Sequence, residues 1–154
     1  MRQRSETIVV STRRGLTEIT GVVRSAVRAA GINEGLVTVF VRHTSASLVI
    51  QENADPAVCR DLEAFLSRLV HDGDPIFTHV EEGDDDMSAH VKAALLKTTE
   101  QVPVVDGELA LGTWQGIYLW EHRSGSHRRQ VALHVIGEPP PNGGPNSPVT
   151  TGRK

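Results

Sequence analysis

The stretch GLVTVFVRHTSASLVI, residues 35–50, decides the fold class because it holds two apolar runs separated only by a short polar interval. Leu36 to Val41 is rich in β-branched residues, which predicts a strand buried on both faces. Leu48 to Ile50 forms a second strand, and the interval between them is too short for a helix. The two runs therefore form a hairpin or one kinked strand, and neither belongs to a strict β–α–β alternation.

Three helices are predicted around these strands. Residues 16–30 repeat apolar side chains at helical spacing and stop at Gly31. Asp55-Pro56 supplies an N-cap and a first helical residue for a second helix, which Asp72-Gly73 ends. Asp86 caps a third helix. The side chains expected on its buried face are Met87, Val91, Ala94 and Leu95.

Short β-prone runs separated by turn residues complete the predicted fold. Asp106-Gly107 predicts a hairpin turn, and Ser124 to Ser126 a turn between the last two strands. The mixture indicates an α+β protein with antiparallel pairing, as one domain over residues 1–138 and a disordered Pro- and Gly-rich tail over 139–154. The remaining strands are expected at 8–10 (ending at Gly15), 102–105, 109–111, 114–121 and 130–136, with 75–80 a strand or an extended loop.

The composition argues against several classes of protein. The net charge is -3, which is unlike the basic surface of a nucleic-acid-binding protein. No apolar segment is long enough to span a membrane, and the first six residues lack a signal core, so we expect no membrane partner and a cytoplasmic location. Cys59 is the single cysteine, which excludes an intrachain disulfide.

Four polar segments lie at the ends of predicted elements, where side chains are held rigidly. His43 to Ser47 follows the first strand of the pair, and Gln51 to Asp55 precedes a helix N-terminus, which favours anions. Residues 79–90 combine two histidines with five carboxylates, and residues 112–123 alternate aromatic side chains before Glu121-His122-Arg123. Each segment alone also fits a structural role, as a turn cap, a solvated acidic loop or a core strand.

The chain resembles the YjbQ-like family in four blocks that occur in the family's order: HTSASL (43–48), ENADP (52–56), DDMxAHxK (85–92) and LGTWQGIYLWEHR (111–123), closed by Gly137-Glu138. The resemblance covers residues 3–138. It implies a compact α+β fold with β-sandwich-like sheets and about three helices, assembled as a homotrimer. Some members are described as secondary thiamine-phosphate synthases. Ser88 stands where the family often has proline, which could loosen the entry to the third helix.

The resemblance also implies roles for particular residues. A divalent metal (Zn²⁺, Mg²⁺ or Mn²⁺) and a small phosphorylated substrate are expected. The implied metal ligands are His43, His79, His90 and Asp86. The implied catalytic residues are Glu52, Asn53, Glu121 and His122, and the implied substrate-binding residues are Ser45, Trp114, Gln115 and Arg123.

Three functions remain open at this point. A thiamine-phosphate synthase would hold Mg²⁺ at Asp85-Asp86 and meet phosphate with Arg123 or Lys92. A metal-dependent hydrolase of a phosphate ester would hold its ion with three histidines and use Glu121 or His122 as general base. A non-catalytic trimeric protein would bind metal or ligand without turnover.

Overall fold

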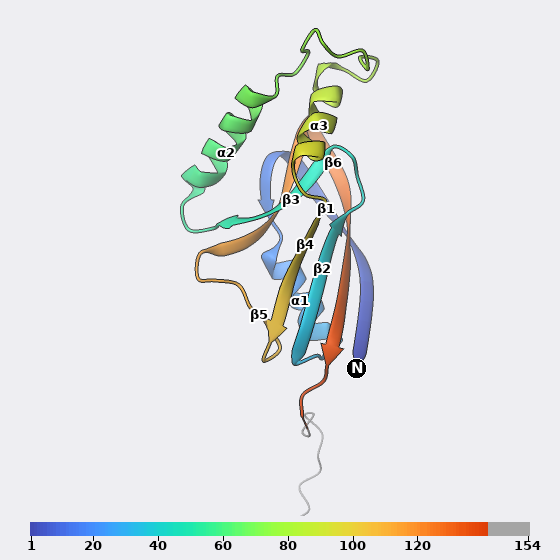
Figure 1. Ribbon diagram of the computed structural model, residues 1–154, viewed down its shortest axis with the longest axis vertical. Helices are drawn as coiled ribbons and strands as arrows, with labels where there is room; N and C mark the ends of the chain where they lie inside the picture. The colour runs from blue at the N-terminus through green and yellow to red at the C-terminus, as the bar shows by residue number, and fades with distance from the viewer. Residues whose placement is uncertain (142–154) are drawn as a thin grey trace, which may run out of the picture.

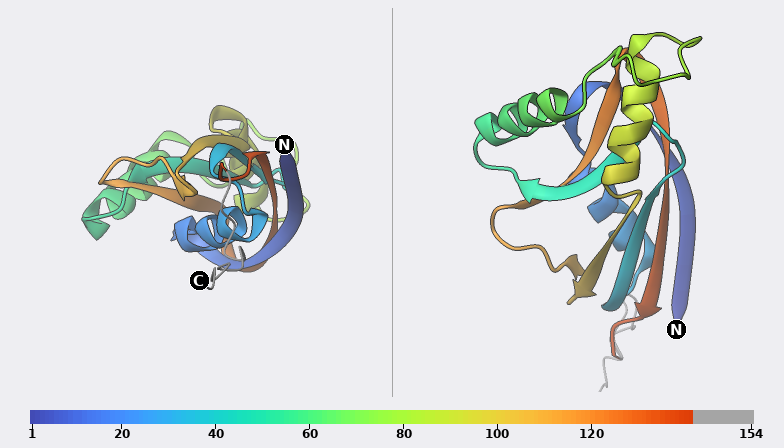
Figure 2. Two further views of the ribbon diagram at one scale, coloured as in Figure 1. Left: turned by 90° about the horizontal axis from the view of Figure 1, so that it is seen from below. Right: turned by 45° about the horizontal axis from the view of Figure 1, so that its top comes forward.

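A six-stranded antiparallel sheet forms the body of the protein in the computed structural model, which describes residues 1–141. Strand β6 (Gln115–Glu138) lies at its centre and pairs with β1 (Arg2–Glu18) along one edge. The sheet curls around helix α1, while α2 and α3 lie together at one end (Figures 1 and 2). This confirms the predicted α+β class. The other strands are β2 (Glu34–Val41), β3 (Ala46–Glu52), β4 (Thr99–Val105) and β5 (Glu108–Leu109).

Strands β2 and β3 both pair with the second edge of β6, one after the other. β2 pairs with residues 131–138 and β3 with residues 115–121, and both run antiparallel to β6. The two apolar runs therefore form one kinked strand and no hairpin. The prediction that the first run is buried on both faces was wrong. Val37, Val39 and Val41 point to one face and are buried, whereas Phe40 on the other face is 43% exposed.

The two longest strands, β1 and β6, are interrupted by one shared bulge. The sequence had predicted a strand end in the first and a turn in the second at this place. Arg13 pairs with Ser126, and the next paired residue, Gly15, faces Glu121. Four residues of β6 therefore bulge out opposite Arg14, and Gly125 adopts a φ of 75° within the bulge. The predictions of a strand end at Gly15 and a turn at 124–126 were wrong, because a glycine with positive φ serves a turn and a bulge equally well.

Helix α1 (Thr20–Ala30) fills the concave face of the curled sheet. Val23 and Val27 are fully buried there against strand residues of the core. The helix begins four residues later than predicted, because Leu16 belongs to β1 and pairs with Trp120. Its end is as predicted, with Gly31 in the left-handed conformation at φ 61°.

Helix α2 (Pro56–Leu69) begins as predicted, with the Asp55 carboxylate accepting a hydrogen bond from the Ala57 backbone N–H. Its apolar stripe is only partly covered, since Leu66 is buried whereas Phe65 is 56% exposed. Residues 75–80 form a loop, which was one of the two alternatives for that segment.

Helix α3 (Asp84–Leu95) differs from its prediction in both start and orientation. It begins two residues before Asp86, so Asp86 lies in the first turn and does not cap the helix. The expected buried face was wrong, since Leu95 is exposed. The fully covered side chains are instead Asp86, Ser88, Ala89, Lys92 and Ala93. This helix turns a mainly polar face inward.

The remaining predictions concern turns and the ends of the chain. Asp106 and Gly107 both have positive φ and close the β4–β5 hairpin, as predicted. β6 ends at Glu138, and the N-terminal ammonium group lies 2.9 Å from the Glu138 carboxylate. Residues 142–154 of the predicted tail lie outside the described residues. Among the helices in residues 1–141, none has the length and apolarity needed to cross a bilayer.

Candidate functional site

A polar pocket of about 500 Å³ opens where α3 meets the bulge of β6. Five parts of the chain supply its walls: the β2–β3 link, the loop before α3, the inner face of α3, the bulge, and β6 just after the bulge. The lining residues are Arg42, His43, Thr44, Ser45, His79, Glu82, Asp86, His90, Arg123 and Arg129. Two sequence blocks more than thirty residues apart, at 42–45 and 79–90, thus meet in one pocket.

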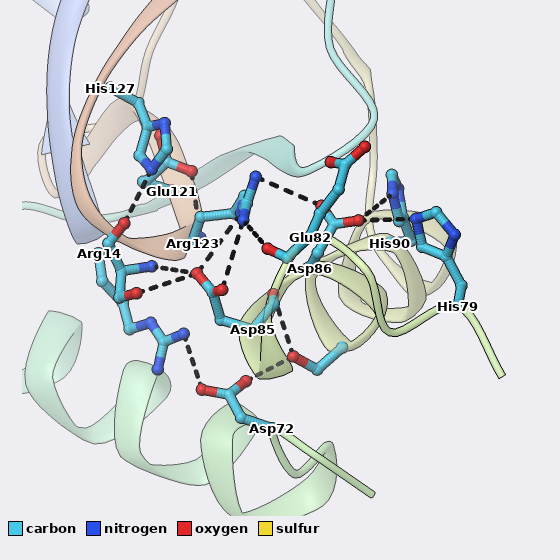
Figure 3. A network of polar contacts seen from close by, with 12 residues as sticks. Arg14, Asp72, His79, Glu82, Asp85, Asp86, His90, Glu121, Arg123 and His127 are labelled. Atoms are coloured by element: carbon cyan, nitrogen blue, oxygen red, sulfur yellow. Dashed lines mark hydrogen bonds and ion pairs between the residues drawn. The ribbon is translucent and has the colours of Figure 1, made fainter. Parts of the chain in front are cut away.

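Three side chains in this pocket converge on one point (Figure 3). His79 Nε2 lies 2.8 Å from Asp86 Oδ2, and His90 Nε2 lies 3.3 Å from the same oxygen. One ligand atom from each residue lies within 4.8 Å of the other two. Asp86 is almost fully buried, while the histidines face the opening. Two imidazoles and one carboxylate are a donor set that suits Zn²⁺ and other divalent transition metals.

A backbone contact fixes the orientation of the His90 ring. His90 Nδ1 lies 3.0 Å from the carbonyl oxygen of Thr44, which can only accept a hydrogen bond. Nδ1 therefore carries the proton, and Nε2 presents a free lone pair toward Asp86 in the neutral ring. Such a second contact from the far ring nitrogen is typical of histidines that ligate metals.

His43 lines the pocket but does not join this group. Its Nε2 accepts a hydrogen bond from the Gln130 backbone N–H at 2.8 Å, so that lone pair is already used. Burial and the nearby Arg129 guanidinium lower the pKa of His43, which keeps the ring neutral. The structure thus separates His43 from the other three expected ligands.

Arg123 bridges the start of α3 to the bulge of β6 (Figure 3). Its guanidinium donates to the Glu82 carbonyl at 2.9 Å and lies 3.5 Å from an Asp86 oxygen. The Asp85 carboxylate accepts from Arg123 and from the Ser124 backbone N–H and hydroxyl. Partial burial alone would raise the pKa of Asp85, but these hydrogen bonds lower it to about 2. Arg123 is therefore held rigidly at the rim of the pocket.

Glu121 has no free oxygen with which to act as a base. It is fully buried and forms a bidentate pair with Arg129, whose Nε donates to Oε1 at 2.7 Å. The Thr12 hydroxyl and the Arg123 backbone N–H also donate to this carboxylate. Burial would raise the pKa of Glu121, but the Arg129 and Thr12 hydrogen bonds lower it. Glu121 therefore positions Arg129, which reaches the pocket.

His122 lies on the other face of β6, behind the pocket wall. Its ring is 1% exposed, and Nε2 lies 2.8 Å from the Ser47 hydroxyl. Burial, followed by the charge of Lys92, lowers the pKa of His122 to about 3. A neutral, enclosed imidazole cannot exchange protons with a substrate in the pocket, so the expected catalytic role does not fit its position.

The other expected site residues lie far from the histidines. Glu52 pairs with Gln115 at one end of β3, and Ala46 pairs with Glu121 at the other. Six residues of strand separate these pairs, or about 20 Å. Asn53 donates its backbone N–H to the Trp114 carbonyl, and the Trp114 side chain is 64% exposed. Within one chain, Glu52, Asn53, Trp114 and Gln115 therefore form a separate cluster. Ser45, by contrast, lines the pocket.

Sequence reasoning missed two arginines of the pocket, Arg42 and Arg129. Arg42 stands beside His43, so its position at a strand exit was a usable signal. Arg129 was missed because its segment was interpreted as a strand that follows a turn, with no site residue assigned to it. Ser88 proves to be buried, with its hydroxyl donating to Asp72, so it ties α3 to the end of α2.

The geometry defines a class of protein: a single-domain α+β protein with a curled antiparallel sheet and a pocket of histidine, carboxylate and arginine. The family model that matches is "UPF0047 protein YjbQ-like", over residues 5–138. The chain belongs to this family.

The relatives match this chain over more than three quarters of their own length. A UPF0047 protein of Synechocystis is 50% identical, covering 89% of this chain and 94% of that protein. The UPF0047 protein YjbQ of Escherichia coli is 43% identical over 70% of this chain and 77% of its own length. Among solved structures, a hypothetical protein of Aeropyrum pernix is 32% identical with a TM-score of 0.78, covering 88% of this chain and 99% of that one. A YjbQ/UPF0047 protein of Clostridium acetobutylicum is 35% identical with a TM-score of 0.74, over 84% and 99%.

Proposed function

We propose that the protein is a metal-dependent enzyme that acts on a small phosphorylated molecule, with the ion held by His79, Asp86 and His90. The observation that carries the proposal is the convergence of these three side chains, with the His90 ring fixed by Thr44 so that Nε2 faces Asp86. Three protein ligands leave coordination positions for water or substrate. A bound divalent ion would polarise a phosphoryl oxygen and make its water more acidic.

The arginines around the ligand group support a phosphorylated substrate. Arg42, Arg123 and Arg129 line the same pocket, and guanidinium groups bind phosphate oxygens with two parallel hydrogen bonds. Their positive charge would also stabilise the charge that develops on a departing phosphate or diphosphate. Glu82 lines the pocket as well and is the carboxylate we assign as proton acceptor, since Glu121 is fully occupied.

Two reactions use this arrangement. Hydrolysis of a phosphate ester needs the metal, the arginines and one water, all of which the pocket can hold. Thiamine-phosphate synthase activity, which the family resemblance implies, needs the same groups for its diphosphate leaving group. It also needs room for a second substrate and an aromatic surface, and Trp114 lies too far away in one chain to provide it. The geometry therefore supports hydrolysis better.

The metal proposal is tested by mass spectrometry of tag-free protein equilibrated with Zn²⁺ or Mn²⁺. We expect one ion per chain in the wild type and at least tenfold weaker binding in His79→Ala and His90→Ala, because each loses one ligand. His71→Ala is the matched control, since that histidine lies on the surface away from the pocket. His43→Ala should keep the ion, which distinguishes this ligand set from the one implied by resemblance. Equal binding in all variants would contradict the assignment.

The reaction is tested separately with p-nitrophenyl phosphate and with the two substrates of thiamine-phosphate synthesis. Turnover that a chelator abolishes supports an enzyme and identifies which reaction it prefers. Metal binding without turnover on either set would favour the non-catalytic alternative, a protein that binds metal or ligand alone.

We further propose that the protein works as a homotrimer in the cytoplasm, as the family resemblance implies. Exposed apolar side chains, including Phe65 and Leu69 on α2 and Ile76 after it, support burial against another chain. Sedimentation equilibrium should give three times the chain mass, and a monomer at micromolar concentration would contradict the trimer.

A further inference from the structure

A smaller pocket, of about 270 Å³, opens beside the ligand group, between the C-terminal half of α3, the link after β2 and the residue before β4. We name it the side pocket. Its lining residues are His43, Thr44, His90, Ala93, Ala94 and Thr98. The first three of these also line the first pocket, so the two cavities meet along one shared edge. A molecule bound in one pocket can therefore extend into the other.

Hydrogen bonds hold both histidines of the shared edge in place. His90 Nδ1 donates to the Thr44 carbonyl oxygen at 3.0 Å, and its Nε2 lies 3.3 Å from Asp86 in the first pocket. His43 Nε2 accepts from the Gln130 backbone N–H at 2.8 Å. In the proposed metal site the ion lies at His90 Nε2, while the same residue forms part of the side-pocket wall. A substrate whose phosphoryl group contacts this ion therefore has its next atoms beside the shared edge.

The side pocket has neutral walls. Ala93 and Ala94 present methyl groups, and Thr44 and Thr98 are uncharged. His43 is a neutral ring as well, because a ring nitrogen that accepts an N–H carries no proton. The arginines of the first pocket do not line the side pocket. A charged group placed here would lose water without gaining a partner among the described residues, so the side pocket favours an uncharged ligand.

The volume limits the size of that ligand. A cavity of about 150 Å³ is enough to enclose a benzene molecule. The side pocket, at about 270 Å³, therefore has room for one ring with a small substituent or for a short branched chain.

We infer that the side pocket is the subsite for the organic part of the phosphorylated substrate, an inference that rests on the proposed metal-dependent function. The substrate is then a phosphate ester of a compact, uncharged organic group. Its phosphoryl group lies at the ion and the arginines of the first pocket, and its organic group lies against Ala93 and Ala94 of α3.

The experiment measures binding to the Mn²⁺-equilibrated protein by isothermal titration calorimetry. The probes are methylphosphonate, benzylphosphonate and 4-carboxybenzylphosphonate, because their P–C bonds resist hydrolysis. Benzylphosphonate should bind about tenfold more tightly than methylphosphonate, since burying roughly 60 Å² of the ring's apolar surface is worth that factor. The added carboxylate of the third probe should remove this gain, because the side pocket offers it no cation.

A matched pair of variants connects the gain to the side pocket. Ala94→Leu fills the pocket from an exposed position on α3, and it should bring benzylphosphonate to the affinity of methylphosphonate. Mass spectrometry should still find one ion per chain in this variant, and methylphosphonate should bind it as it binds the wild type. Ala29→Leu, at an exposed position on α1, is the control and should keep the tenfold difference.

The outcomes distinguish this inference from the function on which it rests. If methylphosphonate binds but the benzyl group adds no affinity, or if the gain survives Ala94→Leu, the subsite is overturned while the metal site stands. Equal affinity for the benzyl and carboxybenzyl probes would overturn the preference for an uncharged group. Absence of any methylphosphonate binding would refute the proposed function itself, and the subsite with it.

Discussion

Replacing Glu121 by glutamine tests whether this carboxylate is structural or catalytic. In the folded protein it accepts hydrogen bonds from Thr12, from two nitrogens of Arg129 and from the Arg123 backbone N–H. Glutamine keeps one oxygen but turns an NH₂ group toward Arg129 Nη2 and the Arg123 N–H. Two hydrogen bonds to a charged acceptor are lost, and the Arg129 charge stays buried without compensation.

The expected loss in unfolding free energy is about 3–5 kcal/mol, from two charge-assisted hydrogen bonds and an unpaired buried charge. That is a large share of the roughly 5–15 kcal/mol that stabilises a typical domain. Urea unfolding followed by tryptophan fluorescence measures the loss. Thr12→Val removes one donor and leaves the ion pair, so it should cost less, about 1.5–3 kcal/mol.

The outcome separates the two roles. If Glu121→Gln unfolds like the wild type, within about 1 kcal/mol, the carboxylate is not needed for stability and the reasoning from its four hydrogen bonds is refuted. If it is destabilised as expected while Zn²⁺ binding at His79 and His90 persists, Glu121 acts by positioning Arg129. The Glu52→Gln variant, at a half-buried position on β3, would serve as a control for a neutral substitution away from the pocket.

Two further predictions address stability. Gly35→Ala should lower the free energy of unfolding by at least about 3 kcal/mol, because a Cβ there would lie 2.2 Å from the Ile136 carbonyl oxygen. Gly21→Ala, which has open space on α1, should raise it by about 0.5–1 kcal/mol. Urea unfolding of both variants checks the contrast. The pKa of Asp85 falls from 3.8 to about 2 on folding, so its stabilisation of about 2 kcal/mol is complete above pH 4 and is lost as the pH falls toward 2. The wild type should therefore lose more stability than Asp85→Asn between pH 5 and 2, and parallel curves would contradict this.

Local patterns in the sequence were sufficient for the fold class and for most elements. The interval between Val41 and Leu48 excluded a helix, and Gly31, Asp55-Pro56 and Asp106-Gly107 placed helix and hairpin ends correctly. These signals act over a few residues, through φ preferences and capping, so the sequence displays them directly.

The sequence also placed the polar blocks that build the pocket, but it could not rank them. His79, Asp86 and His90 lie within one segment, and the spacing of Asp86 and His90 by one helical turn was visible. Whether His43 can also be a metal ligand depends on which of its ring nitrogens already accepts a hydrogen bond. The donor to His43 Nε2 is the Gln130 backbone N–H, which is 87 residues away in the sequence.

Tertiary structure alone decided the face of α3, the bulge of β6 and the partition of the expected residues between two places. α3 turns Asp86 and Lys92 inward because charged partners, and not an apolar layer, cover that face. The fold brings the Arg129 guanidinium onto the Glu121 carboxylate, eight residues earlier in β6, although Gly125 by itself suits a turn as well. Local sequence patterns thus determined whether most segments are helix, strand or turn. Which charges meet depends on strand register over more than a hundred residues, and no local preference encodes that register.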